Sequence, residues 1–478
     1  MEVNFLQTSL VDLNKEKTLR FDVKFHNVFT KIIETRTTTP FLSFFDIEEK
    51  EEREYEVNEI KYVEIGSVSS DGDINAFDLS DNRGLDLAEK ERLIKKIENG
   101  DIFKPKKGSL LIASVRPNLR KFVSITDEEQ DLYFTKAFIY LYPKQNLIES
   151  RILKYLLKTV LFERLVGLCR EGKGYPTLKE NDLKFFFIDD NLIKKLELNK
   201  KKLLEKIDEN ERAILQIKSK IESLQDIIDD VFVQHGLKSV NEKRFEHENI
   251  LIGFSEVSNN FYLRNSSLYH IFWAKYKGVL LEQDKFVKVR LGDLIMPNVH
   301  RVKKGLLEHP MILLNFEDIE PYTGRILNLN YVEEIGSDKN ILIGNDVIIS
   351  KMNNHLGYVF TLPQLSGQKD IVIGSSEFIP YLIKDKTEIL PEFIKYILLV
   401  EDFLNISKFL RSGKSQSHPR IHIKDLLSIK IPLPDLKIQQ KIVSEIQQRE
   451  EKSNQYKEEI RKLREEIDNL IYESLKNG

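Results

Sequence analysis

The sequence predicts an α+β protein in which two similar globular domains are separated by long antiparallel coiled-coil helices. The first observation is length, because 478 residues are too many for one ordinary hydrophobic core. The second is a long internal repeat, and the third is an apolar seam of coiled-coil type after each copy. We therefore expect a first domain at 1–190, a central coiled-coil helix at 191–235, a second domain at 236–432 and a C-terminal coiled-coil helix at 433–478.

The internal repeat is clearest where residues 152–174 are aligned with residues 393–415. Lys154-Tyr155 then lies over Lys395-Tyr396, and Gly172 lies over Gly413. Two upstream blocks also match, namely Phe138-Ile139 with Phe378-Ile379 and residues 108–118 with residues 345–355. Insertions fall between the blocks, as loop variation predicts. The period is much longer than a solenoid unit, so we interpret it as a duplicated domain.

Each copy combines short strands with one amphipathic helix. The strands are rich in Val, Ile and Phe, and a Gly-Lys loop follows the helix. A final strand is expected at 183–188 in the first copy and at 426–434 in the second. Pro432 and Pro434 end the second of these strands and turn the chain into the C-terminal helix.

The segment after each copy has the spacing of a coiled coil. Steps of three and four residues separate the apolar positions, and Asn210 is the one polar break. The central seam comprises Ile207, Ile214, Ile217, Ile221, Leu224, Ile228 and Val231, and the C-terminal seam comprises Ile460, Leu463, Ile467 and Leu470. Each helix alone has a narrow apolar stripe, so we expect the two to pair antiparallel within the chain. A helix of roughly 35 to 40 residues spans about 50 to 60 Å, enough to hold two domains apart.

Composition limits the class of protein. The longest apolar stretch, 152–169, is interrupted by charged residues and predicts an amphipathic helix, not a membrane span. No secretory signal is recognised at the N-terminus, and Cys169 is the only cysteine, so we expect a cytoplasmic protein without disulfides. The formal net charge of −3 means that any binding to nucleic acid must come from local basic surfaces.

Residues 411–446, RSGKSQSHPRIHIKDLLSIKIPLPDLKIQQKIVSEI, resemble the end of a target-recognition domain in the DNA specificity subunits of type I restriction-modification systems. In that family a glycine-containing loop leads into a strand ending Ile-Pro-Leu-Pro, and then into a helix with a glutamine and an Ile-Val pair. Here Ile431 to Pro434, Gln439 or Gln440, and Ile442-Val443 fill those places. The first copy departs from the pattern, because 185–193 lacks both prolines and the glutamine. The order of domain, helix, domain, helix also matches the family.

The resemblance implies a subunit that recognises DNA and has no catalytic residues or bound cofactor of its own. Its implied partners are double-stranded DNA, two modification (methyltransferase) subunits that use S-adenosylmethionine to methylate adenine, and motor-nuclease restriction subunits. The residues are consistent with this, because no methyltransferase motif of the N-P-P-F type and no G-x-G-x-x-G loop occurs. In the phosphate-loop-like 412–415 segment, Lys408 stands where the first glycine should be.

Two alternatives remain open at the sequence level. One is a nuclease or fused restriction enzyme with its own active site, and the other is a coiled-coil scaffold that does not bind DNA. No metal site is expected, since His418 and His422 have no second cluster of ligands nearby in the sequence.

Candidate DNA-binding residues fall into three groups of cationic, amide and hydroxyl side chains, the types that contact phosphates and base edges. The first group lies in the paired Gly-Lys loops: Lys173, Tyr175, Lys414, Ser415, Gln416 and His418. The second lies after paired strands: Arg116, Asn118, Arg120, Lys121, Lys351, Asn353 and Asn354. The third comprises Lys31, Arg36, Asn298, His300, Arg301, Lys303 and Lys304. Helix C-caps, for the first group, and solvated turns, for the second, are the structural alternatives.

Overall fold

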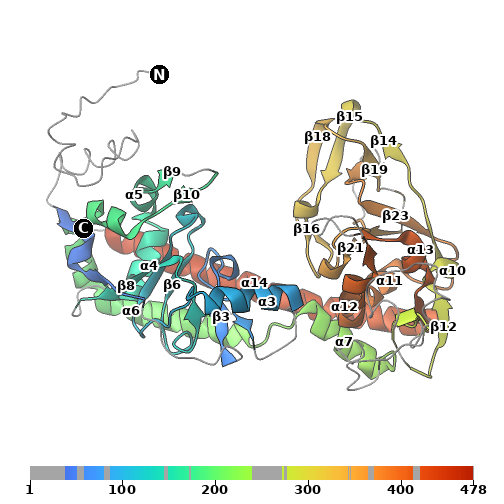
Figure 1. Cartoon of the computed structure of the whole chain (residues 1–478), viewed down its shortest axis with the longest axis horizontal. Helices are drawn as coiled ribbons and strands as arrows, with labels where there is room; N and C mark the ends of the chain where they lie inside the picture. The colour runs from blue at the N-terminus through green and yellow to red at the C-terminus, as the bar shows by residue number, and fades with distance from the viewer. Residues whose placement is uncertain are drawn as a thin grey trace. The chain divides into compact units, whose positions relative to one another are not determined.

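The computed structural model describes residues 38–50, 59–79, 87–144, 149–171, 174–238, 272–273, 277–281, 283–342, 344, 346–363, 371–412 and 420–476. These residues form a mixed helix and strand fold (Figure 1). The chain divides into two compact units, which we describe separately. The first unit comprises 1–217 and 459–478, and the second comprises 218–458.

The first unit is built on an antiparallel sheet in the order β2-β8-β5-β6. Its strands are β2 (Phe45–Ile47), β5 (Leu110–Ala113), β6 (Phe122–Ser124) and β8 (Phe138–Pro143). Strand β5 is buried on both faces, so its side chains alternate between two hydrophobic clusters. Leu110 and Ile112 pack in one cluster, and Leu111 and Ala113 pack in the other. Helices α4 (Ser150–Lys158) and α5 (Phe162–Gly167) contribute Leu153, Leu156 and Leu165 to the first cluster.

Smaller elements complete the first unit. A second sheet has the order β4-β3-β7, with β3 and β7 parallel, and helix α3 supplies Leu93 and Ile97 to the cluster beside it. The bounds are β3 (Lys61–Val63), η3 (Ile65–Ser67), β4 (Phe77–Asp78), α3 (Leu87–Glu98), η4 (Pro117–Leu119) and β7 (Tyr133–Phe134). Two further strand pairs are β9-β10 and β1-β11. The bounds of these strands and of the 3-10 turns beside them are β1 (Thr38–Pro40), η1 (Phe41–Ser43), β9 (Arg170–Glu171), β10 (Pro176–Thr177), η5 (Glu180–Phe185) and β11 (Phe187–Asp189).

The second unit repeats the first sheet in the order β13-β23-β20-β21. Its strands are β13 (Ile295–Pro297), β20 (Val347–Ser350), β21 (Val359–Phe360) and β23 (Phe378–Ile383). Val347 and Ile349 pack in the cluster that contains α11 (Pro391–Ile397) and α12 (Glu401–Leu410), and Ile348 packs in the opposite one. This alternation along β20 is the one seen along β5.

Elsewhere the second unit is larger. A sheet in the order β14-β19-β22-β15-β18 takes the place of β4-β3-β7, and β15 and β22 are parallel as β3 and β7 are. Its strands are β14 (Arg301–Val302), β15 (Gly305–Leu314), β18 (Asn330–Ile335), β19 (Lys339–Ile341) and β22 (Val372–Gly374). The remaining elements are β12 (Val287–Arg290), α10 (Leu291–Leu294), η6 (Phe316–Asp318), β16 (Ile319–Glu320), β17 (Arg325–Ile326), η7 (Asn354–Leu356), β24 (Arg411–Ser412), β25 (Arg420–Ile421), α13 (Ile423–Ser428) and β26 (Lys430–Leu433).

The repeat predicted from the sequence is therefore a repeat of structure. Strands β8 and β23 begin at the aligned residues Phe138 and Phe378, and the two four-strand sheets have the same order and the same antiparallel pairing. Short 3-10 turns, η4 and η7, follow β5 and β20 at matched positions. The two units thus share these elements, and the duplicated domain with its coiled-coil spacers stays a prediction.

The central segment forms two helices, and this corrects the expected continuous seam from Ile207 to Val231. Helix α6 spans Asp190–Lys218 and helix α7 spans Leu224–His235. The chain turns after Lys218, and the Ser223 hydroxyl then accepts a hydrogen bond from the Asp226 N–H and caps α7. Ile221 lies in the turn and is only partly buried.

Helix α14 (Leu436–Lys476) pairs antiparallel with α6 in the first unit and with α7 in the second. In the first unit, Lys195 Nζ donates to Leu475 O at 2.9 Å, and Asn210 Nδ2 donates to Leu463 O at 3.1 Å. Figure 1 shows α6 and α14 running along the first sheet. In the second unit, His235 Nε2 lies 3.1 Å from Glu445 Oε2, and Arg449 bridges Glu222 and Asp230. Among the described residues, no helix has the length and apolar character that crossing a membrane requires.

Candidate nucleic-acid interface

The turn after β5 presents an exposed group of polar and cationic side chains in the first unit. Pro117 is buried and fixes the 3-10 turn η4, whereas Arg116, Asn118 and Arg120 are exposed. Arg116 and Arg120 flank the turn with φ angles of 51° and 57°. A left-handed backbone costs a non-glycine residue about 1–2 kcal/mol, so the surrounding contacts must hold this turn in place.

Those contacts bring two of the predicted groups together. The Arg116 N–H donates to Pro176 O at 2.9 Å, and a β-bridge joins Val115 to Thr177. The turn after β5 thus lies against the β9-β10 loop, where the Arg116 guanidinium lies 5.4 Å from the centre of the exposed Tyr175 ring. Two loops that are distant in the sequence form one surface, which we call the η4 surface: Arg116, Asn118, Leu119, Arg120 and Tyr175.

Lys121, the next predicted residue, has a structural role. Its Nζ donates to Ile65 O at 2.8 Å, so the side chain ties the turn to η3. Partial burial, together with the charge of Arg116, lowers the pKa of Lys121. Arg120 is held differently, because its guanidinium stacks 4.1 Å from the Phe162 ring.

In the second unit, the polar side chains of the matched turn are less available for contact with DNA. Asn354 is buried and donates to Ser350 O, so its side chain serves the fold and is not offered for base contact. Lys351 is paired with Glu377 at 3.7 Å, and Glu377 also holds Arg420 at 2.8 Å. Asn353 occupies the left-handed position that corresponds to Arg116, with φ 55°.

A third group lies within β14 and on both sides of it in the second unit. His300 and Asn298 are joined by a 3.1 Å contact, and Arg301 Nε donates to Asn340 Oδ1 at 3.3 Å. Lys303 pairs with Asp338 at 2.9 Å, and the Lys304 N–H donates to the same carboxylate at 3.1 Å. The structure brings these residues together on one exposed segment, with part of their positive charge balanced by Asp338.

The remaining predicted residues lie outside the residues that the structure describes. They are Lys31, Arg36, Lys173, Lys414, Ser415, Gln416 and His418.

Each unit also contains a Lys-Tyr pair that the sequence alignment matches but that was not among the predicted site residues. Lys154 and Tyr155 face Glu211 of α6, whose Oε1 accepts from the tyrosine hydroxyl at 3.0 Å. In the second unit, Lys395 and Tyr396 lie beside Glu450 of α14. Burial lowers the pKa of Lys154 and Lys395 and raises the pKa of both tyrosines. Each pair attaches a short helix, α4 or α11, to a long helix.

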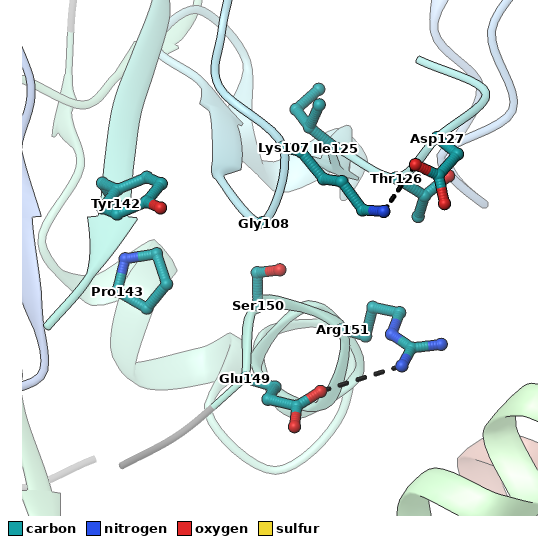
Figure 2. A pocket seen from close by; sticks show the side chains of 10 residues that line it. All are labelled: Lys107, Gly108, Ile125, Thr126, Asp127, Tyr142, Pro143, Glu149, Ser150 and Arg151. Atoms are coloured by element: carbon teal, nitrogen blue, oxygen red, sulfur yellow. Dashed lines mark hydrogen bonds and ion pairs between the residues drawn. The ribbon is translucent and has the colours of Figure 1, made fainter. Parts of the chain in front are cut away.

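A cavity of about 710 Å³ lies between the start of β5 and the first turn of α4 (Figure 2). Its charged side chains are already paired, Lys107 with Asp127 and Arg151 with Glu149 and Asp208. Within the described part of the chain, no group of three or more His, Cys, Asp and Glu side chains is placed to hold a metal ion.

Comparison with known proteins identifies the class of domain. Residues 284–464 match the family model of the type I restriction modification DNA specificity domain. The predicted resemblance of 411–446 lies within that region and is confirmed. Residues 284–464 thus resemble a DNA specificity domain, and this match supports sequence-specific DNA recognition in a type I restriction-modification system.

No curated protein matches the sequence, but solved structures resemble it distantly. A chain from a study of complex assembly and conformational transition of the type I R-M system has a TM-score of 0.38 and 13% identity, covering 87% of this chain and 91% of that one. The HsdS subunit from Thermoanaerobacter tengcongensis has a TM-score of 0.29 and 12% identity, with coverages of 87% and 90%. The type I restriction-modification S subunit from M. genitalium has a TM-score of 0.38 and 14% identity, with coverages of 92% and 95%.

Proposed function

We propose that this chain recognises a bipartite site in double-stranded DNA, with one half-site read by each unit. The observation that carries the proposal is the duplication of one sheet, one turn and one helix attachment in the two units. A repeated reader module offers the same docking geometry twice. Different loop residues on the two modules then select different base sequences.

Local charge supports DNA as the ligand of the first unit despite the net charge of −3. The η4 surface presents two arginines and one asparagine beside an exposed tyrosine. Arginines contact phosphates and guanine edges, and asparagine suits adenine. In the second unit, the segment from Asn298 to Lys304 is the corresponding candidate, together with Lys351 and Asn353.

The proposed role is non-catalytic and depends on partner subunits in the cytoplasm. Two modification subunits, which carry S-adenosylmethionine, methylate adenine in the half-sites that this chain selects. Motor-nuclease subunits complete the complex and cut unmodified DNA. The long helices α6, α7 and α14 are proposed to fix the spacing between the half-sites and to bind the modification subunits.

Domain exchange tests this function directly. Residues 236–432 are replaced by the corresponding residues of a homologue, and the methylated sequences in the host genome are read with and without the gene. One half of the methylated site should change and the other half should persist. The reciprocal exchange of residues 1–190 is the matched control and should change only the opposite half.

Two outcomes would contradict the proposal. A scaffold would give no sequence-dependent methylation with either chimera. A fused restriction enzyme with its own active site would cut or modify DNA without the partner subunits.

A further inference from the structure

We propose that Leu119 is a wedge that inserts into the stacked bases of the half-site bound by the first unit. The inference rests on the proposed function, because it assigns a role to a residue of the η4 surface. Apolar side chains on DNA-binding proteins enter the stack between neighbouring base pairs and partly unstack them. Leu119 was not among the residues predicted to touch DNA, since an isolated leucine in a sequence is an ordinary core candidate.

Comparison of the two copies singles out Leu119. The matched residue in η7 is Leu356, which packs against the core cluster of the second unit. Leu119 is 42% exposed, although Pro117 in the same turn is buried. The matched leucine is therefore partly buried against a core cluster in the second unit, whereas Leu119 is exposed in the first.

The surroundings of Leu119 favour DNA over another protein surface. Arg116 and Arg120 stand on either side of it in the chain, at the two left-handed ends of η4. Each guanidinium is supported by an aromatic ring, Tyr175 for Arg116 and Phe162 for Arg120. Burial lowers the pKa of Lys121 and the charge of Arg116 lowers it further, so Arg116 and Lys121 lie close enough to repel each other. A polyanion relieves that repulsion, and the two arginines are placed to hold phosphates while Leu119 meets the bases.

The rigidity of the turn suits a wedge. Unstacking one base step costs a few kcal/mol. A flexible loop would also lose conformational entropy on binding, and that loss would add to the cost. Here the Arg116 N–H bond to Pro176 O, the Val115–Thr177 bridge and the Lys121 bond to Ile65 O fix the backbone on both sides. The leucine is thus presented on a pre-ordered support.

The test uses the full chain assembled with its modification subunits and a duplex that contains the methylated site. The half-site of the first unit is the one that changes when residues 1–190 are exchanged for those of a homologue. A series of duplexes carries 2-aminopurine at one base step of this half-site each. Its fluorescence rises when neighbouring bases unstack. We expect a rise at one step with the unchanged protein and a loss of that rise by about fivefold or more with Leu119→Ala. A mismatch at that step should restore binding by the variant, because the unstacking cost is then largely removed.

Leu329→Ala is the matched control. Leu329 is 40% exposed and lies in the second unit, so the same substitution is made at a leucine of similar exposure away from the turn. The control should leave both the fluorescence and the affinity unchanged. Leu119→Met, which keeps a long apolar side chain, should retain most of the signal.

Arginine variants distinguish the wedge role of Leu119 from DNA binding in general. Arg116→Ala and Arg120→Ala should each weaken binding to all sequences and lower the salt dependence of binding by about one ion. Normal unstacking with Leu119→Ala would overturn the wedge and leave the proposed function standing. Absence of sequence-specific binding by the unchanged complex would instead overturn the proposed function.

Discussion

At the scale of residues, Gly72 and Gly324 show how closely the two units correspond. Both have positive φ, 83° and 61°. A Cβ at Gly72 would lie 2.6 Å from Phe122 O, and one at Gly324 would clash with Val359 O. Phe122 and Val359 begin the matched strands β6 and β21. The side chains of Lys154 and Lys395 pass over these glycines, with Cε at 3.5 and 3.4 Å from the built Cβ.

Alanine at these glycines is predicted to destabilise its own unit. Gly72→Ala and Gly324→Ala add a clash with a strand carbonyl to the cost of the left-handed backbone, so we expect a loss of about 2–4 kcal/mol each. Gly108→Ala is the control, because Gly108 has φ 85° but open space around its Cβ, and should cost only about 1–2 kcal/mol. Hydrogen exchange of the β6 and β21 amides reports the stability of each unit separately. Equal losses at all three glycines would contradict the steric explanation.

Residue types predicted part of the candidate site and missed the rest for physical reasons. Arg116 and Tyr175 were both named from their loops, but their 5.4 Å contact depends on a bridge between segments that no local pattern reveals. Asn354 was named as a base reader, yet the turn folds it inward. The exposure of Leu119 follows from packing, which differs between two turns of similar sequence position.

At the scale of elements, Asn210 is the polar position that the apolar seam predicted. It is buried where α6 meets α14, and its amide donates to Leu463 O at 3.1 Å and to Glu466 Oε2 at 3.3 Å. The seam residues Ile207 and Ile467 nearby, and Ile471, are fully buried. A buried asparagine in such a seam lowers stability but fixes the register of the two helices.

Asn210→Leu is predicted to raise the stability of the first unit by about 1–2 kcal/mol, because an apolar group replaces a buried amide. Leu463 lies inside α14, so its carbonyl keeps its intrahelical partner. Asn199→Leu is the control on the same helix, since Asn199 is only partly buried and bonds to Lys195 O. Urea denaturation measures both changes. A loss of stability with Asn210→Leu would mean that the amide contacts outweigh the cost of burying it.

The periodicity of the apolar residues does not reveal the turn between α6 and α7. The spacing of Ile217, Ile221 and Leu224 continues the seam on paper. A serine at 223 that caps a new helix competes with that pattern, and the local hydrogen bonds prevail. Two helices, α6 and α7, therefore replace the single helix expected at 191–235.

At the scale of the whole molecule, helix α14 belongs to the second unit up to Glu458 and to the first from Glu459. The other boundary falls between Ile217 and Lys218, at the end of α6. Both units are therefore completed by helices from two parts of the chain. Equivalent attachments use different helices, because Tyr155 bonds to Glu211 of α6 and Tyr396 lies beside Glu450 of α14.

This arrangement allows a sharp test of the proposed spacing role. One heptad is inserted at 217/218 and a second at 458/459, so that the contacts inside each unit are left unchanged. Seven helical residues add about 10 Å with a rotation of only about 20°, which corresponds to about three base pairs of B-DNA. We expect the preferred gap between the two half-sites to lengthen by about that amount while both half-site sequences stay the same. Genome methylation sequencing reads the gap and the half-sites together.

A single insertion, at 217/218 alone, is the control for this experiment. It lengthens one helical path but not the other, so the paired helices cannot both keep their contacts and methylation should fall sharply. If the double insertion gives the original gap, the helices do not set the spacing, and the half-sites must be selected by the two units independently. If it abolishes methylation as thoroughly as the single insertion does, an unchanged helix length is required by the partner subunits, and the spacing role as proposed here is wrong.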